Sequence, residues 1–205
     1  MELRVPGDKS ISQRALILSS LAEGESKLRG LLSGGDSAST AGALRGLGVP
    51  IPILDPGGSE MTISGLGLRG LQSPVGPLNV ENSGTGARLL LGVLAGQPLE
   101  AVVTGDESLR KRPMARITDP LTAMGAHFDA LEVEGRLPIR VRGGPLKEFF
   151  YRLPVASAQL KSALLLAGLV GGVRVHLVEP GRSRDHTERV TSSPTNTSLP
   201  ALENS

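Results

Sequence analysis

The chain has 205 residues, is 39% hydrophobic and carries a formal net charge of +2, which indicates a globular protein with one sizeable core or two small ones. The absence of cysteine excludes disulfides, thiolate nucleophiles and cysteine-ligated metals. No apolar run approaches the ~18 residues that span a bilayer, and the N-terminus lacks the apolar stretch of a signal peptide. We therefore expect a cytoplasmic protein with no membrane association.

The charged and aromatic residues favour small anions over nucleic acid as partners. The net charge is too small for binding along a phosphate backbone, and four aromatic side chains offer little base stacking. Three histidines, His127, His176 and His186, are too widely spaced for a helical zinc motif. Seventeen of the 22 cations are arginine, which grips carboxylates and phosphates with two hydrogen bonds. We expect no metal, no cofactor and no nucleic-acid partner.

The segment from Pro6 to Ala15, PGDKSISQRA, predicts the start of a helix with an anion site at its first turn. A helix N-terminus presents unpaired N–H groups and about half a positive charge. Lys9, Ser10 and, one turn later, Arg14 would add two cations and a hydroxyl, a combination suited to phosphate or carboxylate. The alternative is an ordinary capped helix with two solvated cations.

An internal repeat with a period of about 73 to 77 residues organises the chain. Each unit is predicted to contain a helix, a strand, a second helix and two further strands, the third unit being incomplete. The first helices, each with a cation four residues after its start, are expected at 10–24, 84–96 and 157–168. The strands that follow them are expected at 26–32, 99–104 and 173–178. The second helices are expected at 36–47 and 113–124, and the closing strand pairs at 50–54 with 61–64 and at 127–131 with 138–142.

The first helices are apolar over most of their circumference, so they must be covered on all sides. Parallel burial of the three would bring their N-termini together around one pocket. The residues at these ends suit an anion pocket: glycines at 84 and 86 permit close backbone approach, and Ser157 and Gln159 add polar groups. Any one glycine-rich turn would be ordinary loop chemistry, and Asp36 is open to two interpretations, an N-cap or a side chain that orients the site.

Five ordered motifs resemble those of the 3-phosphoshikimate 1-carboxyvinyltransferase, or EPSP synthase, family. They are Val5–Ser12, Asn82–Thr85, Gly105–Ser108 with Lys111–Met114, Ser157–Gln159 and Ser183–Arg189. The resemblance covers residues 1 to about 190. It implies an inside-out α/β domain built from repeated βαβαββ units, with the third unit truncated. Residues 1–14 would pack on a second domain, and residues 15–190 would form a substrate-binding domain with units at 15–76, 77–150 and 151–190.

The resemblance also implies a reaction in the shikimate pathway, which leads to chorismate and the aromatic amino acids. The family transfers the enolpyruvyl group of phosphoenolpyruvate to the 5-hydroxyl of shikimate 3-phosphate, releases phosphate, and is the target of glyphosate. The implied contacts of shikimate 3-phosphate are Lys9, Ser10, Arg14, Ser157, Gln159 and Arg184. The implied contacts of phosphoenolpyruvate are Lys9, Gly84, Arg112 and Gln159, and Lys9, which faces both substrates, is the candidate catalytic residue.

The family's principal acid and base carboxylates lie in the second half of a chain about twice this length, so we expect a monomeric fragment that lacks the second catalytic domain. Eleven of residues 191–205 are Ser, Thr, Asn or Pro, which predicts a disordered tail. We interpret it as an aberrant tail created by a frameshift or premature stop, rather than the alternative, a natural tail. Apolar surface on the helix at 157–169 would then be exposed. The alternative is a non-catalytic anion-binding fragment or pseudogene product. The related UDP-N-acetylglucosamine enolpyruvyl transferases fit poorly, because Ser10 follows Lys9 and cysteine is absent.

Overall fold

A computed structural model describes residues 7–54 and 60–191. Within these ranges the helices are α1 (Lys9–Leu21), α2 (Gly35–Gly46), α3 (Gly84–Ala95), α4 (Glu107–Arg110), α5 (Ala115–Met124), α6 (Ala158–Gly171) and α7 (His186–Thr191). The strands are β1 (Glu23–Leu28), β2 (Met61–Leu66), β3 (Leu78–Asn79), β4 (Glu100–Thr104), β5 (His127–Ala130), β6 (Ile139–Arg142), β7 (Phe149–Arg152) and β8 (Val175–Val178).

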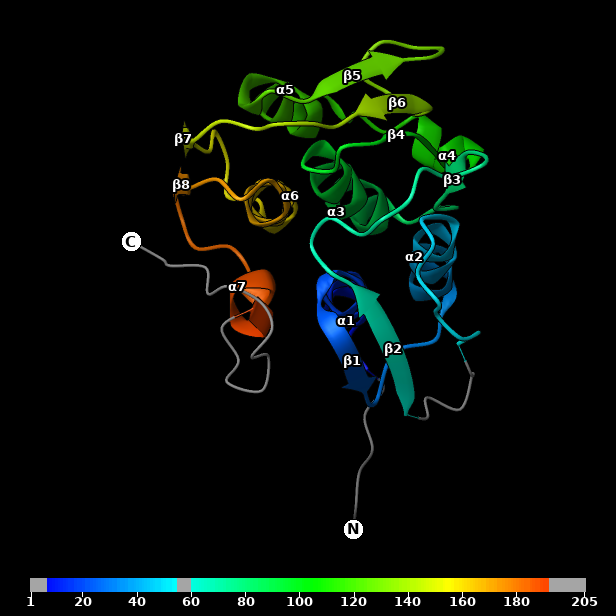
Figure 1. Cartoon of the computed structure of the whole chain (residues 1–205). Coiled ribbons are helices and arrows are strands. Elements are labelled where there is room, and N and C mark those ends of the chain that lie inside the picture. The colour runs from blue at the N-terminus through cyan, green and yellow to red at the C-terminus, as the bar shows by residue number, and fades with distance from the viewer. Residues whose placement is uncertain (1–6, 55–59, 192–205) are drawn as a thin grey trace.

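The elements follow the predicted repeat order. Helices α1, α3 and α6 lie at the centre of the molecule, with α3 next to both of the others (Figure 1). Each is followed by a strand, β1, β4 or β8, and then by a second helix. The expected boundaries of these helices and strands agree with the observed ones to within a few residues.

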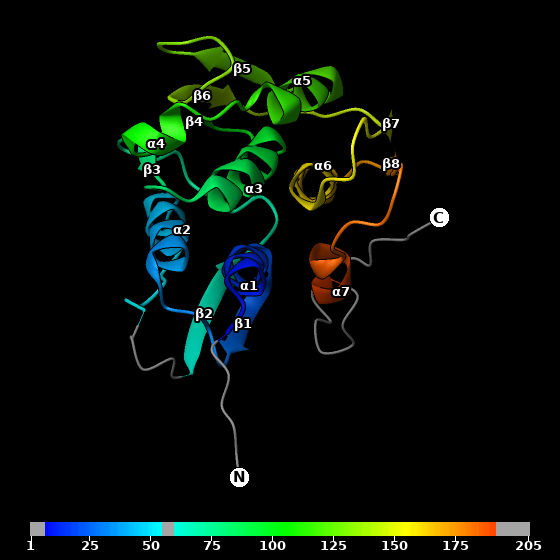
Figure 2. The same ribbon diagram turned by 180° about the vertical axis from the view of Figure 1, so that it is seen from behind.

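Three small sheets surround the central helices (Figure 2). Strands β1 and β2 are antiparallel, with Glu23 opposite Leu66. The largest sheet has the order β3-β4-β6-β5, in which β3 is parallel to β4 and the other pairs are antiparallel. The third sheet pairs β7 with β8 in parallel. Helices inside and sheets outside match the inside-out architecture expected from the sequence.

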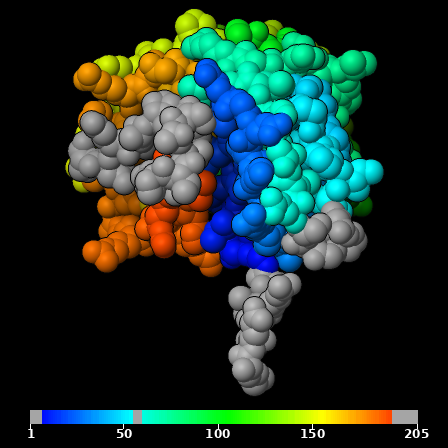
Figure 3. All heavy atoms as spheres, turned by 60° about the horizontal axis from the view of Figure 1, so that its bottom comes forward, coloured from blue at the N-terminus to red at the C-terminus, as the bar shows by residue number. Residues whose placement is uncertain are grey.

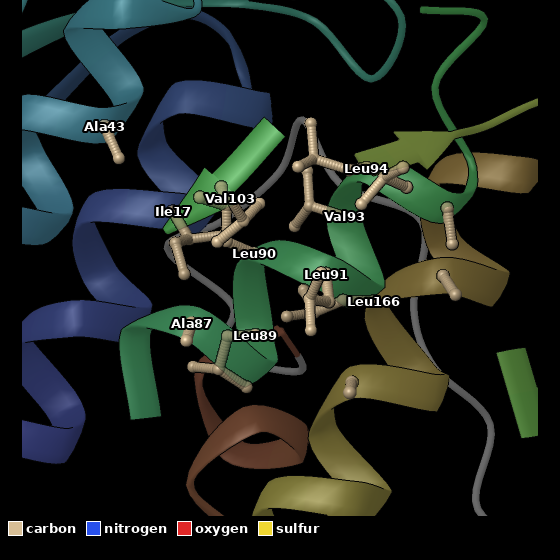
Figure 4. Packing of buried hydrophobic residues seen from close by; sticks show 14 of the residues in the cluster. Ile17, Ala43, Ala87, Leu89, Leu90, Leu91, Val93, Leu94, Val103 and Leu166 are labelled. Carbon is tan, nitrogen blue, oxygen red and sulfur yellow. The ribbon is translucent and has the colours of Figure 1, made fainter. Parts of the chain in front are cut away.

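The hydrophobic core is centred on α3, whose leucines point toward both neighbouring helices (Figure 4). Leu89, Leu91 and Leu94 have no exposed surface, and neither has Leu164 of α6. Close approach of α3 and α6 depends on Gly92, because a Cβ there would lie 2.3 Å from the carbonyl oxygen of Ala163. Helices that are apolar all round are therefore covered all round, as predicted.

Two expectations about secondary structure and exposure were wrong. Residues 50–54 form no strand: Pro50 and Pro52 lack the N–H groups that a ladder needs, and β2 pairs with β1 instead. Helix α6 does not expose an apolar face, since it packs against α3, α5 and β8 and its Leu165 is only 9% exposed. The predicted tail at 191–205, apart from Thr191 at the end of α7, and residues 1–6 of the predicted N-terminal strand lie outside the described residues.

Candidate functional site at three helix N-termini

Helix α1 begins with a capped N-terminus that carries a reachable lysine. The Asp8 carboxylate accepts a hydrogen bond of 2.8 Å from the backbone N–H of Ile11, and this bond is the main reason that the pKa of Asp8 lies below its ordinary value. The Lys9 ammonium lies 2.8 Å from the Asp36 carboxylate, and its side chain is 55% exposed. Gly34, not Asp36, is the N-cap of α2. The N-cap interpretation of Asp36 was therefore wrong, and its carboxylate instead orients Lys9.

Arg14 is more enclosed than a simple surface ligand would be, with 2% of the residue exposed. Its Nη1 donates to the carbonyl and hydroxyl oxygens of Ser10, at 3.0 and 2.5 Å. Its Nε donates to Thr187 of α7 at 2.7 Å, and its Nη2 donates to Ser162 of α6 at 2.8 Å. Burial lowers its pKa, but an arginine stays charged at any physiological pH. Arg14 thus holds Ser10 in place and joins α1 to the third repeat.

The N-terminus of α3 is surrounded by arginine. Ser83 caps the helix by accepting from the N–H of Gly86 at 3.0 Å. A Cβ on Gly84 would lie 2.9 Å from Nη1 of Arg88 and 3.1 Å from Nη1 of Arg112, so both guanidiniums lie against the first helical residue. Burial lowers the pKa of Arg88, and the nearby charges of Arg116 and Arg112 lower it further. Among the described residues, neither Arg88 nor Arg112 forms an ion pair with a carboxylate, so this helix end has a surplus of positive charge.

Two consecutive side-chain hydrogen bonds orient Arg112. Its Nη2 donates to Oδ1 of Asn82 at 2.7 Å, and Nδ2 of Asn82 donates to Asp106 at 2.8 Å. The Asp106 carboxylate also accepts from the N–H of Leu109 at 2.8 Å; this bond, followed by the one from Asn82, lowers the pKa of Asp106. An open hollow bordered by Asp106, Lys111, Arg112 and Pro113 lies beside these hydrogen bonds. Asn82 and Asp106 belong to the sequence motifs, but no sequence pattern indicated that they orient Arg112.

The N-terminus of α6 completes the arrangement. Ser157 is its N-cap, and Gln159 donates through Nε2 to the hydroxyl of Thr85 on α3 at 2.8 Å. Arg184 is exposed just before α7, close enough to Asp8 and Arg14 for its charge to lower the pKa of both. In the space-filling view the residues before and within α7 lie beside those of α1 (Figure 3).

The structure places the predicted site residues at or close to the N-terminal turns of α1, α3 and α6. Direct contacts link Lys9 to Asp36, Ser10 to Arg14, Gly84 to Arg112 and Gln159 to α3, while Ser157 starts α6 and Arg184 lies near Asp8. In the described ranges no group of three or more histidine, aspartate or glutamate residues is placed to hold a metal ion. None of the helices in those ranges is long and apolar enough to cross a membrane.

Fold and site together define a class of protein: an α/β domain of repeated units in which cations and polar groups surround the N-termini of buried helices. The particular family follows from comparison with known proteins. A family model described as EPSP synthase (3-phosphoshikimate 1-carboxyvinyltransferase) matches residues 1–193. The chain belongs to the EPSP synthase family.

Individual relatives agree with this assignment. The chain is 53% identical over 189 residues to the 3-phosphoshikimate 1-carboxyvinyltransferase of Alkalilimnicola ehrlichii, covering 92% of this chain and 42% of that protein. It is 53% identical over 186 residues to the enzyme of the same name from Acidithiobacillus ferrooxidans, covering 91% and 42%. A solved EPSP synthase from Acinetobacter baumannii superimposes with a TM-score of 0.84 at 44% identity, covering 92% and 42%. The chain thus spans a little over two-fifths of the length of these relatives.

Proposed function

We propose that this chain supplies the part of an EPSP synthase that binds shikimate 3-phosphate and contributes to the binding of phosphoenolpyruvate. The observation that carries the proposal is the convergence of three helix N-termini, with Lys9, Arg112 and Gln159 at the three ends. Shikimate 3-phosphate would contact Lys9, Ser10, Arg14, Ser157, Gln159 and Arg184. Phosphoenolpyruvate would contact Lys9, Gly84, Arg112 and Gln159.

The charge distribution suits the chemistry of enolpyruvyl transfer. Both substrates are anions, and the two guanidiniums beside Gly84 offer positive charge at the N-terminus of α3 without an intervening side chain at residue 84. In the proposed reaction the methylene carbon of phosphoenolpyruvate is protonated and the 5-hydroxyl of the sugar attacks the neighbouring carbon. The tetrahedral intermediate then loses a proton from its new methyl group and expels phosphate, which forms the double bond of the enolpyruvyl product. Fixed cations stabilise the negative charge of the departing phosphate, while the general acid and base come from outside this chain.

Phosphorylated substrates do not cross membranes freely, so the activity would belong in the cytoplasm. We propose a monomer as the working unit, because all the residues assigned to the two substrates in this part of the protein come from one chain.

Direct binding tests the proposal. Isothermal titration of the chain with shikimate 3-phosphate should show one site, and Lys9→Met should weaken binding by about tenfold or more, the loss expected for one charge-assisted hydrogen bond. Lys147→Met is the matched control, since Lys147 is also an exposed lysine but lies at the C-terminal end of α5, where its backbone N–H donates to the carbonyl oxygen of Met124. Its dissociation constant should stay within about twofold of the wild-type value. Absence of binding to the wild-type chain, or equal losses in the two variants, would refute the proposal.

A further inference from the structure

Gln13 is a fully buried polar side chain on α1 that touches two other helices. Its Nε2 lies 2.6 Å from Oγ of Ser83, the N-cap of α3. The same nitrogen lies 2.9 Å from Oγ1 of Thr40 and 3.1 Å from the carbonyl oxygen of Asp36, both on α2. The two amide hydrogens are thus shared among three oxygens, and one side chain joins the first repeat to the start of the second.

The packing around this amide leaves little tolerance. A Cβ on Gly86 would lie 2.7 Å from the hydroxyl oxygens of both Ser83 and Thr40, and 3.1 Å from Nε2 of Gln13. Contacts this short would force neighbours to move, so the three helices are tightly packed around Gly86. A buried amide is costly unless it is hydrogen-bonded, which makes the position of Gln13 dependent on all three oxygens.

The partners of Gln13 are the groups that hold the candidate site. The Asp36 residue whose carbonyl it contacts orients Lys9 through its carboxylate, at 2.8 Å. The Ser83 hydroxyl that it contacts caps α3 immediately before Gly84. The amide of Gln13 therefore lies on a hydrogen-bonded route between the lysine on α1 and the glycine turn of α3.

We infer that Gln13 is a positioning residue that sets the separation between Lys9 and the N-terminus of α3, and so tunes anion affinity without touching the ligand. The inference rests on the proposed function for its effect on binding. Loss of the amide should let the first turn of α3 move away from α1, because the other hydrogen bonds of that turn among the described residues run within α3 and its preceding loop or to α6, and none reaches α1.

The test compares Gln13→Met with Gln97→Met. Methionine keeps the length of glutamine and removes its hydrogen bonds. Gln97 is equally buried, with no exposed surface, but it donates only to the carbonyl of Leu68 at 2.8 Å, beyond the C-terminal end of α3. Gln13→Met should raise the dissociation constant for shikimate 3-phosphate by about tenfold, and Gln97→Met by less than about twofold, at similar losses of stability.

Amide hydrogen exchange provides a readout that does not depend on the ligand. At a pH where both variants stay folded, the amides of Gly86 and Ala87 should exchange at least about tenfold faster in Gln13→Met than in Gln97→Met. If Gln13→Met does not fold, Thr40→Val, which removes one of the three oxygens, should show the same changes to a smaller degree.

The outcomes separate the two proposals. If the wild-type chain binds no shikimate 3-phosphate, the proposed function fails, and exchange at Gly86 alone decides whether Gln13 holds α3. Unchanged exchange in Gln13→Met overturns the inference. So does faster exchange with unchanged affinity in a chain that binds, because Gln13 would then stabilise the fold without positioning the site.

Discussion

At the scale of single residues, Gly84 shows how the site depends on a missing side chain. Its Cβ position is flanked by the ends of two arginine side chains and, at 3.7 Å, by Cδ1 of Leu109. Guanidinium groups at the end of flexible stems can give way by a few tenths of an ångström, so the fold should tolerate a methyl group here. The Arg112 guanidinium should be displaced by that methyl group, because among the described residues its side-chain hydrogen bond is to Asn82.

We therefore expect Gly84→Ala to weaken phosphoenolpyruvate binding to the chain saturated with shikimate 3-phosphate by about tenfold, and glyphosate binding as well. The free energy of unfolding should change by less than about 1 kcal/mol. Calorimetric titration and urea denaturation measure the two quantities. Gly76→Ala serves as control, because a Cβ at Gly76 meets no atom within 4 Å. Unchanged binding of both compounds by Gly84→Ala would remove Gly84 from the site.

At the scale of secondary-structure elements, a buried ion cluster ties α6 to the end of β8 and to α7. The Lys161 ammonium lies 2.8 Å from the carboxylate of Glu179 and 2.7 Å from that of Glu188, and its side chain is only 9% exposed. Burial, the largest single influence, lowers the pKa of Lys161. The hydrogen bonds that Lys161 donates to the two carboxylates, together with the attraction of their charges, outweigh burial, so that the pKa is raised above its ordinary value. This cluster, with the bonds from Arg14 to Ser162 and Thr187, holds α7 on the domain.

Lys161→Met should lower the free energy of unfolding by about 3–5 kcal/mol, because it leaves two carboxylates without the cation between them. Lys111→Met is the control: the Lys111–Glu107 pair is 68% and 86% exposed and should contribute less than about 1 kcal/mol. Urea denaturation at neutral pH measures both. Equal effects would show that the buried cluster adds no more than a surface ion pair.

The same cluster predicts a loss of stability at alkaline pH. Folding raises the pKa of Lys161, so the folded state holds this proton more tightly than the unfolded state. The contribution to stability is fully present below the unfolded pKa of ~10.4 and is lost as pH rises through the folded value. The difference in unfolding free energy between the wild type and Lys161→Met should therefore shrink between about pH 10 and pH 12. A constant difference over that range would assign the effect of the variant to packing alone.

At the scale of the whole molecule, three repeats share one plan but differ in their sheets. The second repeat has a four-stranded sheet, whereas the first and third each show a strand pair in the described ranges. The central helices are nonetheless buried in all three, because α3 packs against α1 and α6, α2 and α7 pack against α1, and α5 packs against α3 and α6. The packed core therefore supports the candidate site at the helix N-termini.

The chain alone should bind shikimate 3-phosphate but release no phosphate from phosphoenolpyruvate, since the proposed acid and base lie outside it. Adding the part of the Alkalilimnicola ehrlichii relative that this chain does not match, expressed separately, should restore turnover. A coupled phosphate-release assay measures this, with Lys9→Met in the same mixture as the control that should reduce it. Turnover by the chain alone would place the catalytic groups within these 205 residues, and binding without restored turnover would favour a non-catalytic anion-binding fragment.

The sequence by itself determined the repeat, the three apolar helices and the residues at their N-termini, because periodicity, capping and glycine turns are local properties. The strand predicted at residues 50–54 was wrong, because two prolines there prevent regular strand pairing. The sequence also left the role of Asp36 open. Only the tertiary structure decided that Asp36 pairs with Lys9, that Arg14 reaches α6 and α7, and that Gln13 joins three helices. These contacts connect residues up to 173 positions apart, and their partners are selected by the packing of the helices, which local pattern does not encode.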